Sequence, residues 1–182
     1  MTGTPASRGT SLPEFVALMA LVSALDALSI DGMLPALQLI GAEFGIAAGN
    51  RPQLIISLFF LGMAIGQMFG GPISDTLGRK RAIFGFLVVY AVGCLLAIYS
   101  QSFGMILAAR VLQGFGAAGP YVISLAMVRD RYAGEAMARI SSFIMAVFIL
   151  VPMIAPAMGQ GVMWLAGWRA IFVAFLLLAG LA

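Results

Sequence analysis

Five apolar runs, each long enough to cross a lipid bilayer as a helix, constrain this chain more than any other feature. They cover residues 15–40, 54–71, 82–99, 103–128 and 140–163. A helix needs roughly 20 apolar residues to cross the roughly 30 Å of hydrocarbon in a bilayer. Lipid satisfies no backbone polar group, so only helices and closed barrels span that layer. We therefore predict an all-α, polytopic bundle of membrane helices.

A sixth apolar run, residues 169–182, is shorter than a full span and stays apolar to its last residue. We expect residues 12–182 to form six spans with the sixth helix truncated. Residues 1–11 are rich in Thr, Ser, Gly and Pro, and we expect them to form a disordered cytoplasmic lead. The apolar run behind this lead is too long for the hydrophobic region of a cleavable signal peptide.

The composition excludes a soluble globular domain. Hydrophobic residues make up 62% of the 182-residue chain and charged residues only 9%, whereas soluble domains carry about 25% charged residues. The net charge of +3 does not indicate nucleic-acid binding, because the basic residues lie between spans and form no continuous stripe. The chain has no histidine and a single cysteine, Cys94. We therefore expect no metal site, no intramolecular disulfide and no enzyme chemistry.

Basic residues are distributed unevenly between the two ends of the predicted bundle. If the N-terminus is cytoplasmic, the cytoplasmic segments hold seven of them: Arg8, Arg79, Lys80, Arg81, Arg129, Arg131 and Arg139. The outer segments hold two, Arg51 and Arg169. Cytoplasmic loops of membrane proteins carry such an excess of Lys and Arg, so we predict a cytoplasmic N-terminus.

Three ionisable residues lie deep within predicted spans, namely Asp26, Asp31 and Arg110. Each costs roughly 2.5–3.5 kcal/mol to insert, which makes each a functional candidate. At 1.5 Å per helical residue, Asp31 and Arg110 lie about 14 Å and about 10 Å from the outer end. Their similar depth and opposite charge predict an ion pair across the bundle interior. Such a pair either fixes the helix register or takes part in transport.

Proton exchange at Asp31 is the functional interpretation of this pair. A carboxylate beside arginine stays ionised, and a buried carboxyl that loses its arginine binds a proton more readily. A cationic substrate could compete for the same carboxylate. Asp26 lies about 140° around the helix from Asp31, so the two acids are not expected to share one cavity. Gln113 lies on the face of Arg110, where it either lines the cavity or hydrogen-bonds to a neighbour.

Small residues and prolines predict how the helices pack. Gly62, Gly66 and Gly70 recur at four-residue spacing in the second run, which is typical of close helix contact. The fourth run contains a comparable cluster of small residues over positions 114–120. The fifth run carries Pro152 and Pro156 one turn apart, which predicts a bend. That bend either fits the helix to its neighbours or controls leakage through the bundle.

Six short motifs, in order along the chain, resemble those of the major facilitator superfamily of secondary transporters. Residues 71–81, with the pattern G-x-x-x-D-x-x-G-R-K-R, resemble its loop between helices 2 and 3, with Thr76 where Arg or Lys is usual. Residues 31–37 and 128–130 look like the D-x-x-L-P-A-L and V-R-D motifs of the Bcr/CflA drug-resistance branch. Residues 109–118 resemble the R-x-x-Q-G-x-G-A motif of helix 4.

The last two motifs lie near the C-terminal end. Residues 155–159 are similar to the antiporter motif of helix 5, with Ala155 in place of one usual glycine and Gln160 in place of another. Residues 167–172 look like the G-W-R-x-I-F sequence that opens helix 6.

The resemblance implies the N-terminal six-helix half of a twelve-helix fold, with the substrate bound between two halves. It implies a role for Arg110 in proton coupling and a gating loop formed by Gly71, Asp75, Gly78, Arg79, Lys80 and Arg81. It also implies an antiporter-helix motif at Pro152, Ala155, Pro156 and Gly159.

The expected function is proton-coupled export of small amphipathic or cationic compounds across a bacterial inner membrane. The proton gradient supplies the energy, and no cofactor is expected. The expected partners are the lipid bilayer, the substrate, and a missing C-terminal half or a second half-chain. One alternative is a proton symporter or a metabolite exporter of the same fold. The other is a non-transporting fragment or an interaction subunit that pairs with another half.

Overall fold

The computed structural model describes residues 12–46 and 49–181, and all regular secondary structure in these residues is helical. The predicted all-α class is therefore confirmed. The elements are α1 (Leu12–Asp31), η1 (Leu34–Ala36), α2 (Leu37–Glu43), η2 (Arg51–Gln53), α3 (Leu54–Leu77), α4 (Arg79–Ile98), α5 (Phe103–Arg131), α6 (Gly134–Ala166) and α7 (Arg169–Leu181). The predicted lead at residues 1–11 lies outside the described residues.

Five helical segments are long and apolar enough to cross a membrane: Ala17–Glu43, Arg51–Leu77, Arg79–Ile98, Phe103–Asp130 and Gly134–Ala166. Each corresponds to one of the five predicted runs. The helix α7 has 13 residues and is shorter than these segments. A count of six spans therefore stays a prediction.

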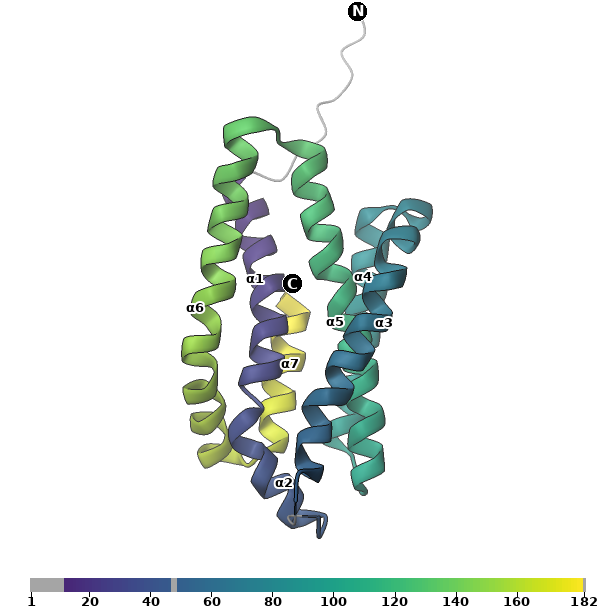
Figure 1. Cartoon of the computed structure of the whole chain (residues 1–182), viewed down its shortest axis with the longest axis vertical. Helices are drawn as coiled ribbons and strands as arrows, with labels where there is room; N and C mark the ends of the chain where they lie inside the picture. The colour runs from purple at the N-terminus through teal and green to yellow at the C-terminus, as the bar shows by residue number, and fades with distance from the viewer. Residues whose placement is uncertain (1–11, 47–48, 182) are drawn as a thin grey trace, which may run out of the picture.

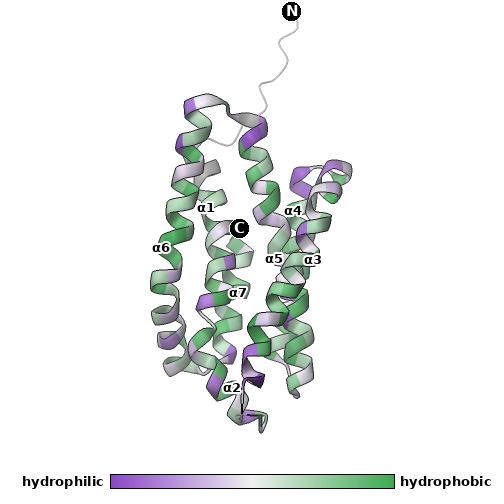
Figure 2. Cartoon of the chain, in the orientation of Figure 1, coloured by the Kyte–Doolittle hydropathy of each residue, from purple (hydrophilic) through white to green (hydrophobic). Residues whose placement is uncertain are grey.

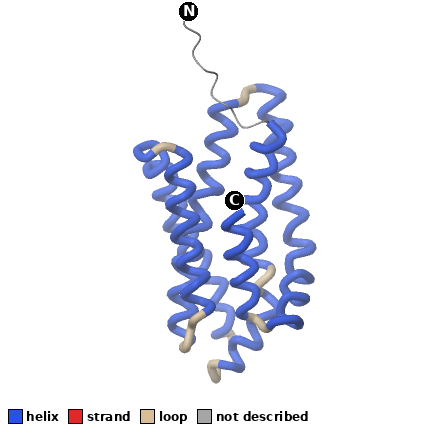
Figure 3. Tube along the Cα trace, turned by 180° about the vertical axis from the view of Figure 1, so that it is seen from behind, coloured by secondary structure: helices blue, strands red, loops and turns tan. Residues whose placement is uncertain are grey.

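The long helices run up and down one common axis (Figure 1). The turns that follow α3 and α5 lie at one end of the bundle, and the connections that precede α3, α5 and α7 lie at the other end. Hydrophilic residues gather towards both ends, while the middle is mostly hydrophobic (Figure 2). The loops that join the helices are short (Figure 3). Arg79, Lys80, Arg81 and Arg129 consequently share one end, as the charge distribution predicted.

The first membrane segment is broken rather than continuous. The helix α1 ends at Asp31, and a 3-10 turn with Pro35 near its start leads into α2. Proline lacks a backbone N–H and cannot continue the hydrogen-bond ladder of a helix. The break at Pro35 places Asp31 at a helix end.

The predicted loop at residues 71–81 is mostly helical, contrary to expectation. The helix α3 continues through Pro72 to Leu77, and α4 begins at Arg79. Only Gly78 separates them, with a φ of 85° that favours glycine. One residue of left-handed backbone is enough to reverse the chain, so the charged residues extend two helices rather than forming a loop.

Glycines let α5 pack directly against α3 and α4. A Cβ atom at Gly62 would lie 2.0 Å from the carbonyl oxygen of Val111. A Cβ at Gly114 would lie 2.0 Å from the oxygen of Phe59, and one at Gly116 would lie 2.3 Å from the nitrogen of Tyr90. Such distances leave no room for a side chain, so backbones touch at these crossings. The close packing predicted from the small residues is confirmed.

The remaining helices complete the bundle around α1. The helix α1 packs mainly against α6, and α7 contacts α4, α6 and α1. The α1–α6 crossing is also close, because a Cβ at Gly159 would lie 2.0 Å from the carbonyl oxygen of Gly32. This contact fixes α6 against the break at the end of α1.

The orientation in the membrane can be tested with single cysteines. Cysteines at Asn50 and Gln101 should react with an impermeant thiol reagent added outside sealed cells, and one at Ala136 should not. All three positions are exposed, and the native Cys94 is fully buried, so the background should be low. Labelling of the Ala136 variant from outside would reverse the predicted orientation. Gly49 and Gly134 are less suitable positions because both have positive φ.

Candidate functional site

Arg110 lies in the bundle interior with no exposed surface. Its guanidinium donates three hydrogen bonds, one within α5 and one to each of α1 and α3. Nη1 donates to Oε1 of Gln113 at 2.6 Å, Nη2 to the carbonyl oxygen of Ser29 at 2.9 Å, and Nε to that of Ile55 at 3.2 Å. The guanidinium also lies over the ring of Phe59, 4.5 Å from its centroid. The cation is therefore held by neutral oxygens and an aromatic face.

The predicted ion pair between Asp31 and Arg110 is wrong. The described residues form three ion pairs, and neither residue takes part in them. Asp31 ends α1 and is only partly buried, whereas Arg110 faces Ser29 on another face of the same helix. Depth alone did not predict the partner, because the carbonyl of Ser29 satisfies the cation without a carboxylate.

A wider network of buried polar groups surrounds Arg110. Nε2 of Gln113 donates to Sγ of Cys94 at 3.1 Å, and the hydroxyls of Ser29 and Tyr90 hydrogen-bond to each other at 2.5 Å. All four side chains are almost fully buried. Gln113 therefore bonds to its neighbours, which was one of its two predicted roles.

Sequence reasoning missed four members of this network, namely Ser29, Phe59, Tyr90 and Cys94. Tyr90 and Cys94 lie one helical turn apart on α4 and therefore share a face. That spacing could have indicated a polar stripe on this helix.

Asp31 adjoins the segment that resembles the antiporter motif. The next residue, Gly32, touches the backbone of Gly159, and a Cβ at Gly32 would lie 3.6 Å from the carbonyl oxygen of Ala155. Ala155 and Gly159 are both buried. The motif therefore packs against the break in the first membrane segment, beside a candidate proton acceptor.

The two prolines of that motif lie inside α6. The helix runs from Gly134 to Ala166 through both Pro152 and Pro156. Each proline removes one backbone hydrogen bond from the ladder. The predicted role of these prolines in shaping the antiporter helix stays a prediction.

Asp26 has a different environment from Asp31. Its side chain is only 5% exposed, and its Oδ1 atom has no hydrogen-bond partner. Asp31 lies about 140° away on the same helix and is partly exposed. The two acids do not share one environment, in agreement with the prediction.

The predicted gating residues surround the turn at Gly78. Arg79 forms ion pairs with Asp75 at 3.1 Å and with Asp130 of α5 at 3.2 Å, and it donates to the hydroxyl of Ser74 at 2.6 Å. Exposed ion pairs of this kind contribute about 0–1 kcal/mol each. The arrangement is therefore suited to breaking and re-forming.

Gly71, Lys80 and Arg81 complete the predicted gating set. Lys80 and Arg81 are exposed in the first turn of α4, and Gly71 lies within α3 with open space around its Cα.

A second charged cluster, which sequence reasoning did not predict, lies at the opposite end. Glu43 accepts hydrogen bonds from the Trp168 indole nitrogen at 2.5 Å and from Arg169 at 2.8 Å. Arg169 also donates to the carbonyl oxygen of Ser100 at 3.2 Å. The cluster joins the ends of α2 and α7 to the α4–α5 connection. The pair Trp168–Arg169 within the G-W-R sequence was the available signal.

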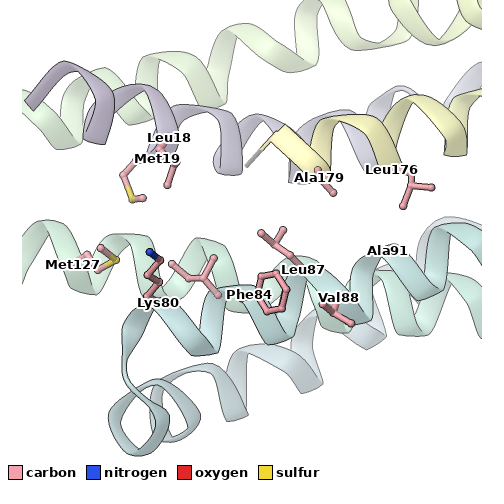
Figure 4. Close-up of a pocket in the computed structure, with 12 residues that line it drawn as sticks. Leu18, Met19, Lys80, Phe84, Leu87, Val88, Ala91, Met127, Leu176 and Ala179 are labelled. Carbon is pink, nitrogen blue, oxygen red and sulfur yellow. The ribbon is translucent and has the colours of Figure 1, made fainter. Parts of the chain in front are cut away.

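An apolar groove of about 600 Å³ lies between α4 and the helices α1 and α7. Leu18, Phe84, Leu87 and Leu176 line it, with Lys80 at one end (Figure 4). Neither acid of α1 nor Arg110 borders this groove. We therefore place the candidate site at the buried polar groups rather than at this groove.

A sequence profile described as Major Facilitator Superfamily matches residues 19–182. The chain belongs to the Major Facilitator Superfamily. With its several membrane-length helices, it is a multi-pass membrane protein.

Three curated relatives of this chain have names that refer to drug resistance. The chain is 33% identical to a "Bicyclomycin resistance protein homolog" of Haemophilus influenzae, over 92% of this chain and 42% of the relative. It is 35% identical to a "Chloramphenicol resistance protein" of Pseudomonas aeruginosa, over 89% of this chain and 39% of the relative. It is 32% identical to "Multidrug resistance protein MdtL" of Salmonella typhi, over 79% and 36%. The chain thus spans about two fifths of the length of these relatives.

Proposed function

We propose that this chain forms the N-terminal half of a proton-coupled secondary transporter that exports small amphipathic compounds. The observation that carries the proposal is a set of ionisable groups inside a membrane bundle of this superfamily: the buried Asp26 and Arg110 and the partly buried Asp31. Such residues are costly within a membrane and mark substrate or proton pathways. Relatives named for resistance to bicyclomycin, chloramphenicol and multiple drugs favour export of drug-like compounds.

Asp31 acts as the acceptor of a proton or of a cationic substrate group. It lies where the helix is interrupted, so a small movement of α1 or α6 changes its access to water. Broken helices form the binding sites of many transporters. Arg110 holds positive charge in the interior without a carboxylate partner, and it favours the ionised state of any carboxyl that approaches it. Gln113 holds the guanidinium in place.

The gating residues and the antiporter motif link this site to movement. The ion pairs of Arg79 form a latch that the second half of the transporter engages or releases. Pro152, Ala155, Pro156 and Gly159 shape α6 against the break beside Asp31. The protein lies in a bacterial inner membrane with its N-terminus in the cytoplasm. It uses the proton gradient, and no cofactor takes part.

The partner is a C-terminal half or a second half-chain. In the most apolar 18-residue stretch of the segments that contain α3 and α6, only 28% and 22% is buried inside the bundle. The corresponding share is 56% for the first membrane segment and for α5. The exposed surfaces of α3 and α6 are therefore available to another helical bundle, and the substrate would bind between the two bundles.

The variant Asp31→Asn in the complete transporter tests the assignment of Asp31. It should abolish export driven by an imposed pH gradient, because an amide cannot exchange a proton, while the protein still inserts. The exposed acid Glu135 provides a matched control, and Glu135→Gln should leave export unchanged. Transport in everted membrane vesicles measures both variants and also the direction of movement. Normal proton coupling in the Asp31→Asn variant would remove this residue from the mechanism, and uptake by the wild type would identify a symporter.

A further inference from the structure

Asp26 is a buried acid that the structure leaves without a full set of partners. It lies in α1, five residues before the end of that helix at Asp31, with 5% of its surface exposed, and Oδ1 accepts no hydrogen bond from the described residues. Buried polar groups are normally hydrogen-bonded, so an orphan carboxyl oxygen requires an explanation. The proposed function counts Asp26 among the ionisable groups of the bundle but assigns it no role of its own.

The face of α1 that carries Asp26 points into the bundle. Met19, Val22 and Ser29 lie on the same stripe at helical spacing, and each is at most 1% exposed. The carbonyl of Ser29, one turn further along, accepts the hydrogen bond from Arg110. Asp26 therefore lies one helical turn from the contact that joins α1 to α5.

Among the residues that the structure describes, no basic group is paired with Asp26. On α5, Arg110 directs its three donor nitrogens to Gln113, Ser29 and Ile55. On α4, the Tyr90 hydroxyl is bonded to Ser29, and Cys94 is bonded to Gln113. The buried residues of α6 and α7 are all apolar or glycine, and Asp31 lies about 140° around α1 from Asp26.

The remaining ionisable groups on the neighbouring helices lie near their ends. Glu135 and Arg139 of α6 and Arg129 and Asp130 of α5 are exposed, and Arg169 of α7 is paired with Glu43. On α4, Lys80 and Arg81 are exposed in the first turn, and Arg79 is paired with Asp75 and Asp130. None of them forms an ion pair with Asp26.

We propose that Asp26 is a second proton-binding site, separate from Asp31, and that it carries its proton in the arrangement seen here. A lone carboxylate without a cation is strongly disfavoured in an apolar interior, whereas the neutral acid needs only ordinary hydrogen bonds. The inference rests on the proposed function in one respect: in a proton-coupled transporter, opening of the bundle would let water reach Asp26 and take up this second proton.

Infrared spectroscopy of the protein in lipid bilayers tests the inference without any transport measurement. At neutral pH the wild type should show the C=O stretch of a protonated carboxylic acid. The variant Asp26→Asn should lose that band, and the variants Asp31→Asn and Glu135→Gln should keep it. Absence of the band from the wild type, or its persistence in Asp26→Asn, would overturn the inference.

A chemical measurement on the wild type avoids any doubt about folding of the variant. A hydrophobic carbodiimide reacts with protonated carboxyls in apolar surroundings, and mass spectrometry of the peptides locates the adduct. We expect modification at Asp26 at neutral pH, and an unmodified Asp26 would contradict the proposal. The outcome separates the two hypotheses: a transporter without proton coupling overturns the proposed function, whereas only the band and the adduct decide the state of Asp26.

Discussion

Replacing Arg110 with alanine should lower the free energy of unfolding by about 3 kcal/mol. Hydrogen bonds to charged groups contribute about 1.5–3 kcal/mol each, and Arg110 makes three of them with no exposed surface. Removing the charge also relieves the cost of burying it, which offsets part of the loss. The truncation further leaves a void beside Phe59, which packs against the guanidinium.

Three other variants identify which of these effects dominates. Arg110→Met fills the volume without the charge, so it should be less destabilising than alanine if the void matters most. Arg110→Lys keeps the charge but cannot reach three acceptors in a fork, so it should be intermediate. Arg51 is exposed, and Arg51→Ala should change stability by no more than about 0.5 kcal/mol. Reversible unfolding in mixed lipid and detergent measures all four, and equal stability of Arg110→Ala and Arg51→Ala would contradict a structural role for the network.

The sequence predicted the helices well because lipid leaves the backbone few alternatives. All five long apolar runs are helical, the first with a break after Asp31, since an unpaired peptide group inside a bilayer costs several kcal/mol. The glycine spacing in residues 62–70 predicted close contact for a similarly direct reason, because only small residues let two backbones touch. The charged turn at residues 71–81 was less predictable: a single residue with positive φ replaced the expected loop.

The partners within the site were far less predictable than the helices. Helical periodicity tells which residues share a face of a helix, and it correctly placed Gln113 on the face of Arg110, where the two side chains hydrogen-bond. It does not tell which helix lies opposite. Charge complementarity then favoured Asp31, although a backbone carbonyl on a neighbouring helix is an equally available acceptor inside a membrane bundle. The same limit hid the contact of Glu43 with Arg169, because these residues are distant in sequence and meet only in the folded bundle.

Replacing Gly159 with alanine should destabilise the α1–α6 crossing, whereas the same change at Gly161 should not. A Cβ atom at Gly159 would lie 2.0 Å from the carbonyl oxygen of Gly32, and the obstacle is backbone that cannot rotate away. The two helices must separate, at a cost of about 1–3 kcal/mol for overpacking. A Cβ at Gly161 meets nothing within 4 Å, so alanine there should stabilise the helix by about 0.5–1 kcal/mol. The two positions belong to the same helix, which makes Gly161→Ala a closely matched control.

The Gly159 variant also tests whether α6 controls Asp31, the proposed proton acceptor. Gly32 follows Asp31 directly, so a shift of α6 at this contact moves the end of α1 where that acid lies. In the complete transporter we expect Gly159→Ala to weaken export driven by a pH gradient, while Gly161→Ala exports normally. Unfolding measurements on the purified proteins separate a local shift from a general loss of structure. If Gly159→Ala were as stable and as well coupled as Gly161→Ala, the close contact would not constrain Asp31, and the antiporter motif would have to act through some other part of α6.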